Sequence, residues 1–164
     1  MKRTKNISLC ALFAVITAIL SWITIPTPFG LPITLQTFAV SLCGFLLGSK
    51  RGTVTTALYL LMGAVGLPVF SAFQGGFGVL LSATGGFLWG FIALSFFCGL
   101  SAKYFWILGL FICYIAGIIQ LSLVSGSSLF SAALTSLPFL FKDILLIFAA
   151  KQISKRIKLE DLYD

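Results

Sequence analysis

The sequence predicts an all-α integral membrane protein, a single domain of residues 1–164 arranged as a bundle of six transmembrane helices. Of the 164 residues, 59% are hydrophobic and only 9% are charged, whereas soluble domains carry about 25% charged residues. The apolar residues also gather in runs that are too long for the core of an ordinary globular domain. Most of the protein surface is therefore expected to face lipid.

Six apolar runs are candidate spans, and short segments rich in glycine, proline or serine separate them. They cover residues 7–25, 31–48, 53–65, 85–100, 104–124 and 138–153. The first is longer than the apolar region of about 7–15 residues in a signal peptide, so it is expected to remain uncleaved. The third is short for a hydrocarbon core about 30 Å thick, so we expect it to extend into the following residues or to tilt less.

The basic residues indicate an orientation for these spans. Ten of the eleven lysines and arginines precede the first run, join the second to the third or the fourth to the fifth, or close the sixth. The other three connections, 26–30, 66–84 and 125–137, carry no charge. The positive-inside rule then predicts that both termini are cytoplasmic and that the charge-free connections face outward.

One outward connection is unusual because it is both glycine-rich and apolar. It reads GLPVFSAFQGGFGVLLSATGG from residue 66 to residue 86. Glycine allows sharp bends and close backbone approach, and irregular backbone near membrane depth is tolerated where it is buried in protein or lines a cavity. We expect this segment to fold back onto the bundle rather than to form a disordered loop.

A lysine and an aspartate interrupt the last apolar run. Asp143 is the only acidic residue before Glu160, and Lys142 precedes it in PFLFKDILLIFAA. A charge in hydrocarbon costs roughly 2.5–3.5 kcal/mol on the most lenient scales, so it usually has a partner or a ligand. Asp143 and Gln36 are expected at similar depth, which favours an outward-facing pocket for a small, mostly apolar solute. The alternatives are a buried pair that fixes the last span, or a Lys142 side chain that reaches the outer water.

Other polar residues of the outer half are few, and each one alone is more often a helix–helix hydrogen bond than a ligand contact. Their number suggests that some converge on the pocket. They are Thr34, Gln36, Thr37, Gln74, Thr84, Tyr114, Gln120, Lys142 and Asp143.

Several function classes are disfavoured. The chain has no histidine and its four cysteines are widely separated, so we expect no enzyme activity, no metal and no cofactor. The segment GFLLGSK, 44–50, has one residue too few for a phosphate-binding loop and follows no strand. ATP hydrolysis would thus require another subunit. The net charge of +7 is explained by topology signals rather than by nucleic-acid binding.

Small residues recur at four-residue spacing, which lets helices approach closely. Examples are Ala14 with Ala18, Gly44 with Gly48 and Gly86 with Gly90. Packing within the bundle is the simplest interpretation of each pair. The first span could instead present Ala14 and Ala18 to a partner, because a terminal span can be peripheral.

The stretches LPITLQTFAVSLCGFLLGSKRG and TALYLLMGAVGLPVFSAFQGGFGVLLSATGGFLWGF resemble the BioY family, the biotin-binding S components of energy-coupling factor transporters. The resemblance implies a six-helix bundle in the bacterial plasma membrane that captures biotin from outside. It also implies a transmembrane T subunit, which docks on the Ala14 and Ala18 face, and two ABC-type ATPases. Some members of the family act without these subunits.

The resemblance also implies a ligand site. Asp143 matches the acidic residue of the family that accepts the two N–H groups of the ureido ring of biotin, and residues 74–86 match the loop over the pocket. The full set of expected ligand-binding residues is Asp143, Lys142, Gln36, Thr34, Gln74, Gly75, Gly76, Thr84 and Tyr114.

The chain departs from the family pattern around this aspartate. The family commonly has Pro-Gly-Asp followed three residues later by lysine, where this chain has Phe141-Lys142-Asp143 and Leu146. The family motif GPTGGY is SATGGF here, at 82–87. Either Lys142 or backbone N–H groups would bind the ligand carboxylate, or the ligand is a related solute such as a biotin precursor. Two alternatives remain for the function. The protein could be an S component for another vitamin-like solute, or a structural membrane protein with a vestigial pocket.

Overall fold

The computed structural model describes residues 2–28, 31–100 and 104–157. Its elements are α1 (Lys2–Trp22), β1 (Thr24–Ile25), β2 (Ile33–Thr34), α2 (Gln36–Ala64), η1 (Ser71–Phe73), α3 (Phe77–Leu81), α4 (Gly85–Cys98), α5 (Phe105–Ser125) and α6 (Leu129–Ser154). The two short strands pair antiparallel, with Thr24 opposite Thr34. Apart from this hairpin the regular structure is helical, as the sequence predicts.

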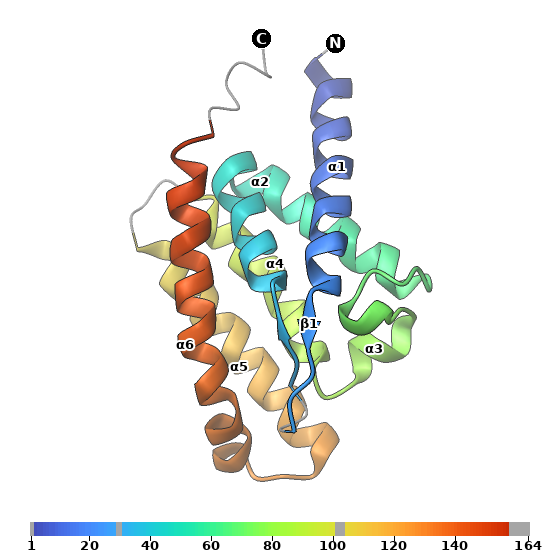
Figure 1. Ribbon diagram of the computed structural model, residues 1–164, viewed down its shortest axis with the longest axis vertical. Coiled ribbons are helices and arrows are strands. Elements are labelled where there is room, and N and C mark those ends of the chain that lie inside the picture. The colour runs from blue at the N-terminus through green and yellow to red at the C-terminus, as the bar shows by residue number, and fades with distance from the viewer. Residues whose placement is uncertain (1, 29–30, 101–103, 158–164) are drawn as a thin grey trace.

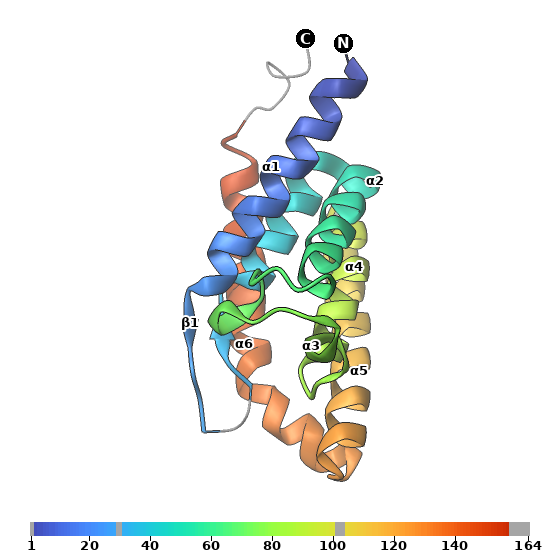
Figure 2. The ribbon, with the colours of Figure 1, turned by 90° about the vertical axis from the view of Figure 1, so that its right-hand side faces the viewer.

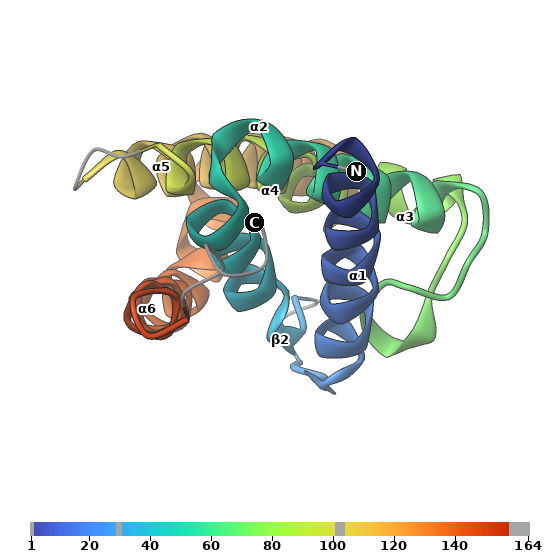
Figure 3. The same cartoon turned by 90° about the horizontal axis from the view of Figure 1, so that it is seen from above.

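The helices form an elongated bundle (Figure 1). The start of α1, the bend of α2 and the end of α6 lie toward one end, and the connection between α5 and α6 lies at the other. Seen along the bundle, α4 and α5 lie in one layer, while α1 and α6 stand apart from each other on the opposite side (Figure 3). In the part of the chain that the structure describes, three helical segments are long and apolar enough to cross a membrane, namely Thr4–Trp22, Phe105–Ser125 and Leu129–Ser154, and α4 is a shorter apolar helix.

Gly48 divides α2 into two helical halves, at the place where the sequence predicts the second candidate span to end. The run 31–48 begins before α2, while most of it and of the run 53–65 lies within α2, and Gly48 has non-helical dihedrals, φ 79° and ψ 170°. A left-handed φ of this kind is accessible to glycine at little steric cost. The chain therefore reverses its course at Gly48 without a separate loop, so Lys50 and Arg51 lie inside the helix.

The last helix begins earlier than the sequence suggested. α6 starts at Leu129 rather than at Pro138, and Ser128 caps it by accepting a hydrogen bond from the Ser131 N–H at 3.2 Å. Proline lacks an N–H and normally ends or kinks a helix. Here the helix continues through it, so Asp143 lies near the middle of α6 rather than in its first turn.

Small residues allow close contact between α4 and its neighbours. A Cβ on Gly90 would lie 2.5 Å from Cys113 Cα of α5, and one on Gly86 would meet the Ala116 carbonyl. Packing within the bundle is thus confirmed for this glycine pair. All four cysteines are free and buried, as expected from their apolar surroundings.

Ala14 and Ala18 also lie inside the bundle. Their side chains are 0% and 4% exposed and belong to the main core with Val40 and Tyr59 of α2. The structure thus corrects the expectation that this pair forms a docking surface, because the helical period turns it toward α2. The exposed face of α1 carries Ala11, Val15 and Ile19 instead.

Candidate functional site

A cavity lies between β2, the first turn of α2, the loop 65–84 and helices α4 to α6. Most of its wall is apolar and includes aromatic rings from α4 and α6, while its polar groups come chiefly from β2, α2 and α6. The lining residues are Leu31, Pro32, Thr34, Gln36, Thr37, Phe70, Ser71, Val79, Thr84, Phe87, Leu88, Phe91, Leu94, Leu110, Cys113, Tyr114, Phe139, Lys142 and Asp143.

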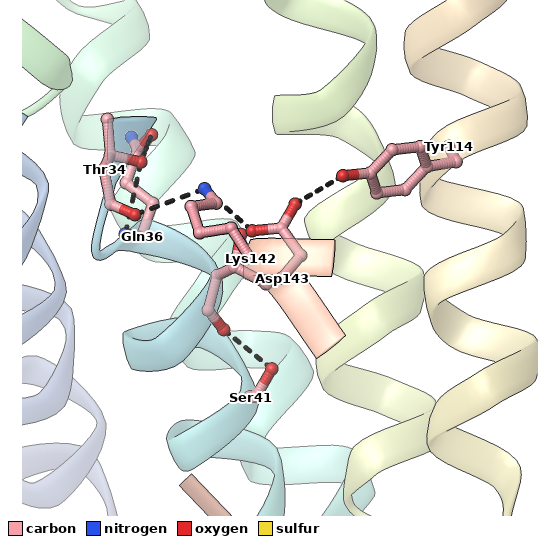
Figure 4. A network of polar contacts seen from close by, with 7 residues as sticks. Thr34, Gln36, Ser41, Tyr114, Lys142 and Asp143 are labelled. Atoms are coloured by element: carbon pink, nitrogen blue, oxygen red, sulfur yellow. Dashed lines mark hydrogen bonds and ion pairs between the residues drawn. The ribbon is translucent and has the colours of Figure 1, made fainter. Parts of the chain in front are cut away.

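Asp143 is the polar group of this cavity that most needs a partner, because its charged side chain is buried. The Tyr114 hydroxyl donates a hydrogen bond of 2.7 Å to Asp143 Oδ2, and Lys142 Nζ lies 2.8 Å from Asp143 Oδ1 (Figure 4). The lysine contact is an ion pair without hydrogen-bonding geometry, because Oδ1 has no hydrogen-bond donor among the described residues. Asp143 Oδ1 therefore has Lys142 as its charge partner and accepts no hydrogen bond from the described residues.

Lys142 connects α6 to the β-hairpin. Besides its ion pair, Lys142 Nζ donates to the Thr34 carbonyl oxygen at 3.4 Å, and its side chain is 22% exposed. The lysine therefore neutralises Asp143 in the cavity wall. Although adjacent helical residues point about 100° apart, the flexible lysine stem allows its ammonium group to return to the carboxylate.

A second polar group of the cavity centres on Gln36, the first residue of α2. Gln36 Nε2 donates to the Tyr59 hydroxyl at 2.7 Å, and the Thr34 hydroxyl donates to Gln36 Oε1 at 3.2 Å. The sequence analysis missed Tyr59, which is 0% exposed, because a tyrosine in an apolar run is typical of a packed core. It holds the Gln36 amide in place from the second half of α2.

The loop 65–84 folds onto the bundle, as the sequence predicts. Val69, Phe70 and Leu80 are 6%, 0% and 1% exposed. Gln120 of α5 fixes the end of the loop, since its Nε2 donates to the Leu80 and Ser82 carbonyl oxygens at 2.9 and 2.7 Å. Gln120 therefore braces the cavity wall rather than lining it.

The structure brings six of the nine expected ligand-binding residues to the cavity and leaves three outside it. Those six are Thr34, Gln36, Thr84, Tyr114, Lys142 and Asp143. Gln74 and Gly75 are exposed and Gly76 is half-buried, and none of the three is among the lining residues.

The three residues outside the cavity shape the loop. The Gln74 carbonyl accepts a hydrogen bond from the Phe70 N–H at 2.9 Å, and the Gly76 N–H donates to the Gly63 carbonyl at 2.7 Å. Gly76 has a φ of 97°, which favours glycine. The glycines are thus explained by the turn, and the residues that the loop contributes to the cavity wall include Phe70 and Ser71.

The cavity of this helical membrane protein is mostly apolar and contains a neutralised acid with a few amide and hydroxyl groups. Such a site is typical of a membrane protein that binds a small solute. The chain belongs to the BioY family, which it matches over residues 1–160. The expected family is thereby confirmed.

Curated relatives share most of their length with this chain. It is 37% identical to the "Biotin transporter BioY" of Thermotoga maritima over 156 residues, which are 90% of this chain and 92% of the relative. It is 35% identical to the "Probable biotin transporter BioY" of Pyrococcus horikoshii over 162 residues, 95% of this chain and 98% of the relative. Both relatives are named as transporters.

A solved structure shares the fold. It is the crystal structure of the S-component for biotin from an ECF-type ABC transporter, at 25% sequence identity and a TM-score of 0.77. The match covers 99% of this chain and 97% of that one. The fold of this chain is therefore similar to that of the S-component over nearly its whole length.

Proposed function

We propose that this protein is the biotin-binding subunit of a vitamin uptake system, which captures biotin outside the cell and releases it inside. The observation that carries the proposal is Asp143 Oδ1, a buried carboxylate oxygen at the cavity that lacks a hydrogen-bond donor among the described residues. Membership of the BioY family and the names of its relatives identify the solute.

The cavity suits the chemistry of biotin. The ureido ring of biotin offers two N–H donors, and a carboxylate can accept both. Tyr114 holds Oδ2 of Asp143 from the opposite side, and its own ring packs edge-on against Phe87 at a centroid distance of 5.4 Å. The aromatic and aliphatic wall accommodates the apolar sulfur-containing ring and the hydrocarbon chain.

Two kinds of group could bind the carboxylate of biotin, namely the Lys142 ammonium or backbone N–H groups. Lys142 already interacts with Asp143 and with the Thr34 carbonyl, so it can approach the ligand carboxylate only by leaving or sharing these partners. Backbone N–H groups of the loop are the other source of donors. Biotin and its uncharged carboxamide, compared on the Lys142→Ala protein, separate the two arrangements.

The direct test is equilibrium binding of labelled biotin to the purified protein in detergent. Tight binding that Asp143→Asn abolishes supports the proposal. If a folded sample binds no biotin, the solute is a different one, and desthiobiotin and other vitamins are the next probes. If Asp143→Asn changes neither binding nor uptake, the pocket is vestigial.

We further propose six crossings of the plasma membrane, with both termini in the cytoplasm. The bend of α2, which carries Lys50 and Arg51, lies toward the same end as the start of α1 and the end of α6 (Figure 1). The connection between α5 and α6 at the opposite end is free of charge. Lys103 and Lys158, which also support this orientation, lie outside the described residues. Labelling of single cysteines with an impermeant maleimide in whole cells tests the orientation.

Release inside the cell is proposed to depend on a T subunit and two ABC-type ATPases. The crystal structure with a similar fold is that of an S-component from an ECF-type ABC transporter. In this chain, the segment 44–50 resembles a phosphate-binding loop but is incomplete. The exposed face of α1 at Ala11, Val15 and Ile19 is the proposed contact, in place of Ala14 and Ala18. Substitution Ala11→Trp is expected to prevent co-purification of the partners while biotin binding is retained.

A further inference from the structure

The last turn of α1 holds the segment 68–74, which we call the strap. The Ser21 hydroxyl is within hydrogen-bond distance of the Val69 carbonyl and of the Ala18 carbonyl of its own helix, and its one proton is shared between them. Trp22 Nε1 donates to the Pro68 carbonyl at 2.7 Å. The indole of Trp22 also stacks on the Phe73 ring, with centroids 4.9 Å apart and planes inclined by 27°. The η1 turn within the strap lies beside the end of α1 (Figure 2).

The same strap forms part of the cavity wall. Phe70 and Ser71 line the cavity, and the Phe70 ring packs edge-on against Tyr59 at a centroid distance of 5.5 Å. Tyr59 in turn accepts the hydrogen bond from Gln36. A displacement of the strap would therefore alter both the apolar wall and the support of the Gln36 amide.

The conformation of the strap depends on these contacts. Ala72 and Phe73 are consecutive non-glycine residues in the left-handed region, with φ values of 54° and 58°. Such a pair is unfavourable for a free chain and persists where the surrounding structure determines it. Phe73 is 61% exposed, so burial contributes little to its position, whereas the stack on Trp22 fixes its ring.

We propose that Ser21 and Trp22 are positioning residues for the ligand pocket, because they hold the strap against it from the end of α1. Neither residue lines the cavity, so they act through Phe70 and Ser71. The proposal rests on the proposed function.

The first arm of the test measures binding kinetics. Trp22→Ala is expected to increase the dissociation rate of labelled biotin roughly tenfold, because a stacked ring pair and a hydrogen bond are lost. The association rate should rise as well, so the equilibrium affinity changes less than the dissociation rate. Trp22→Phe keeps a ring on Phe73 and is expected to show a smaller increase. Trp106→Ala removes a half-buried tryptophan of α5 outside the cavity and should leave both rates unchanged.

The second arm needs no ligand. Hydrogen exchange of residues 68–76 should be faster in Trp22→Ala than in the natural protein, since the Phe70 N–H is bonded within the strap to the Gln74 carbonyl. This arm is informative even if biotin proves not to be the solute. If Trp22→Ala does not fold, Phe73→Ala removes the same stack from the exposed side.

Two results would overturn the proposal. Unchanged exchange in a folded variant would show that α1 does not hold the strap. Faster exchange with unchanged biotin rates would show that the strap does not control the pocket. A failure of the natural protein to bind biotin would instead contradict the proposed function and leave the exchange result standing.

Discussion

Within residues 2–28, 31–100 and 104–157, buried side-chain polar atoms without a hydrogen-bond partner lie in two regions, and one of these regions is at the cavity. Asp143 Oδ1 is at the cavity, whereas Thr55 Oγ1 of α2 and Ser95 Oγ of α4 lie in the helix packing. The buried atom at the cavity belongs to a charged side chain that Lys142 neutralises, whereas the two atoms in the helix packing belong to neutral hydroxyl groups.

Packing explains why the second region is not a site. A Cβ on Gly52 would lie 3.0 Å from Ser95 Oγ, and one on Gly44 would lie 2.7 Å from Cys98 Cβ. The backbone of α2 therefore presses directly against α4 on both sides of the Gly48 bend, and the hydroxyl faces peptide groups. An unpaired hydroxyl costs far less than an unpaired carboxylate, so the fold can tolerate it.

The largest expected effect is on biotin binding by Asp143→Asn. The amide keeps the shape of the side chain but can present N–H donors where the ligand also has donors, and it removes the charge that Lys142 neutralises. We expect roughly a hundredfold loss of affinity, which corresponds to one charge-assisted hydrogen bond or more. Equilibrium binding measures it, with Ser95→Ala as the matched control at the other unpaired atom. Comparable losses in both variants would contradict the distinction between the regions.

Gly44→Ala is expected to lower thermal stability and to leave the biotin affinity unchanged. The added methyl group would meet the Ser95 carbonyl and the Cys98 side chain, and overpacking of this kind typically costs about 1–3 kcal/mol. Thermal unfolding in detergent should occur at a lower temperature, while the folded fraction binds biotin with natural affinity. A variant that is stable but binds weakly would place the α2–α4 contact in the ligand site.

Lys142→Ala is expected to weaken biotin binding by about tenfold, because Asp143 loses its neutralising cation in a largely buried position. The partial exposure of the lysine limits the effect. If biotin and its carboxamide lose affinity equally, Lys142 acts through Asp143. If only biotin loses affinity, the ammonium group contacts the ligand carboxylate.

The sequence could predict the pocket acid but not the packing that supports it. Asp143 and Lys142 were recognisable because a charge in an apolar run is costly, and the loop 65–84 was recognisable because it is apolar and glycine-rich. The support from Tyr59 and Phe70 was not predictable, since both are ordinary core residues until tertiary contacts bring them to Gln36 and the cavity. The glycines at 75 and 76 were assigned to ligand binding although they serve the turn.

The helix boundaries show a similar limit. Proline and glycine are the strongest local signals for a helix end. The glycine signal holds here, since the helical dihedrals of α2 break at Gly48, whereas α6 continues through Pro138. At Pro138 the local signal alone does not decide the helix boundary. The orientation of Ala14 and Ala18 was uncertain for a related reason, because spacing alone does not say which neighbour a small-residue face meets.

Tyr114→Phe is expected to have a smaller effect on the pocket. It removes the 2.7 Å hydrogen bond to Asp143 Oδ2 but keeps the ring that packs against Phe87. A single hydrogen bond to a charged group contributes about 1.5 kcal/mol or more, and partial rearrangement of Asp143 reduces the loss. We expect about a fivefold weaker affinity for biotin. An unchanged affinity would mean that the ligand alone positions the carboxylate.

The smallest effects are expected at the packed hydroxyls, and they test the comparison most sharply. Ser95→Ala and Thr55→Val remove the atoms that lack partners while nearly preserving volume. Since no hydrogen bond to either atom is lost among the described residues, thermal stability should be unchanged or slightly higher, within about 0.5 kcal/mol. Biotin affinity should also be unchanged. A clear loss of stability would mean that a water molecule or an alternative rotamer satisfies these hydroxyls, and the crossing of α2 and α4 would then be a polar contact rather than a purely steric one.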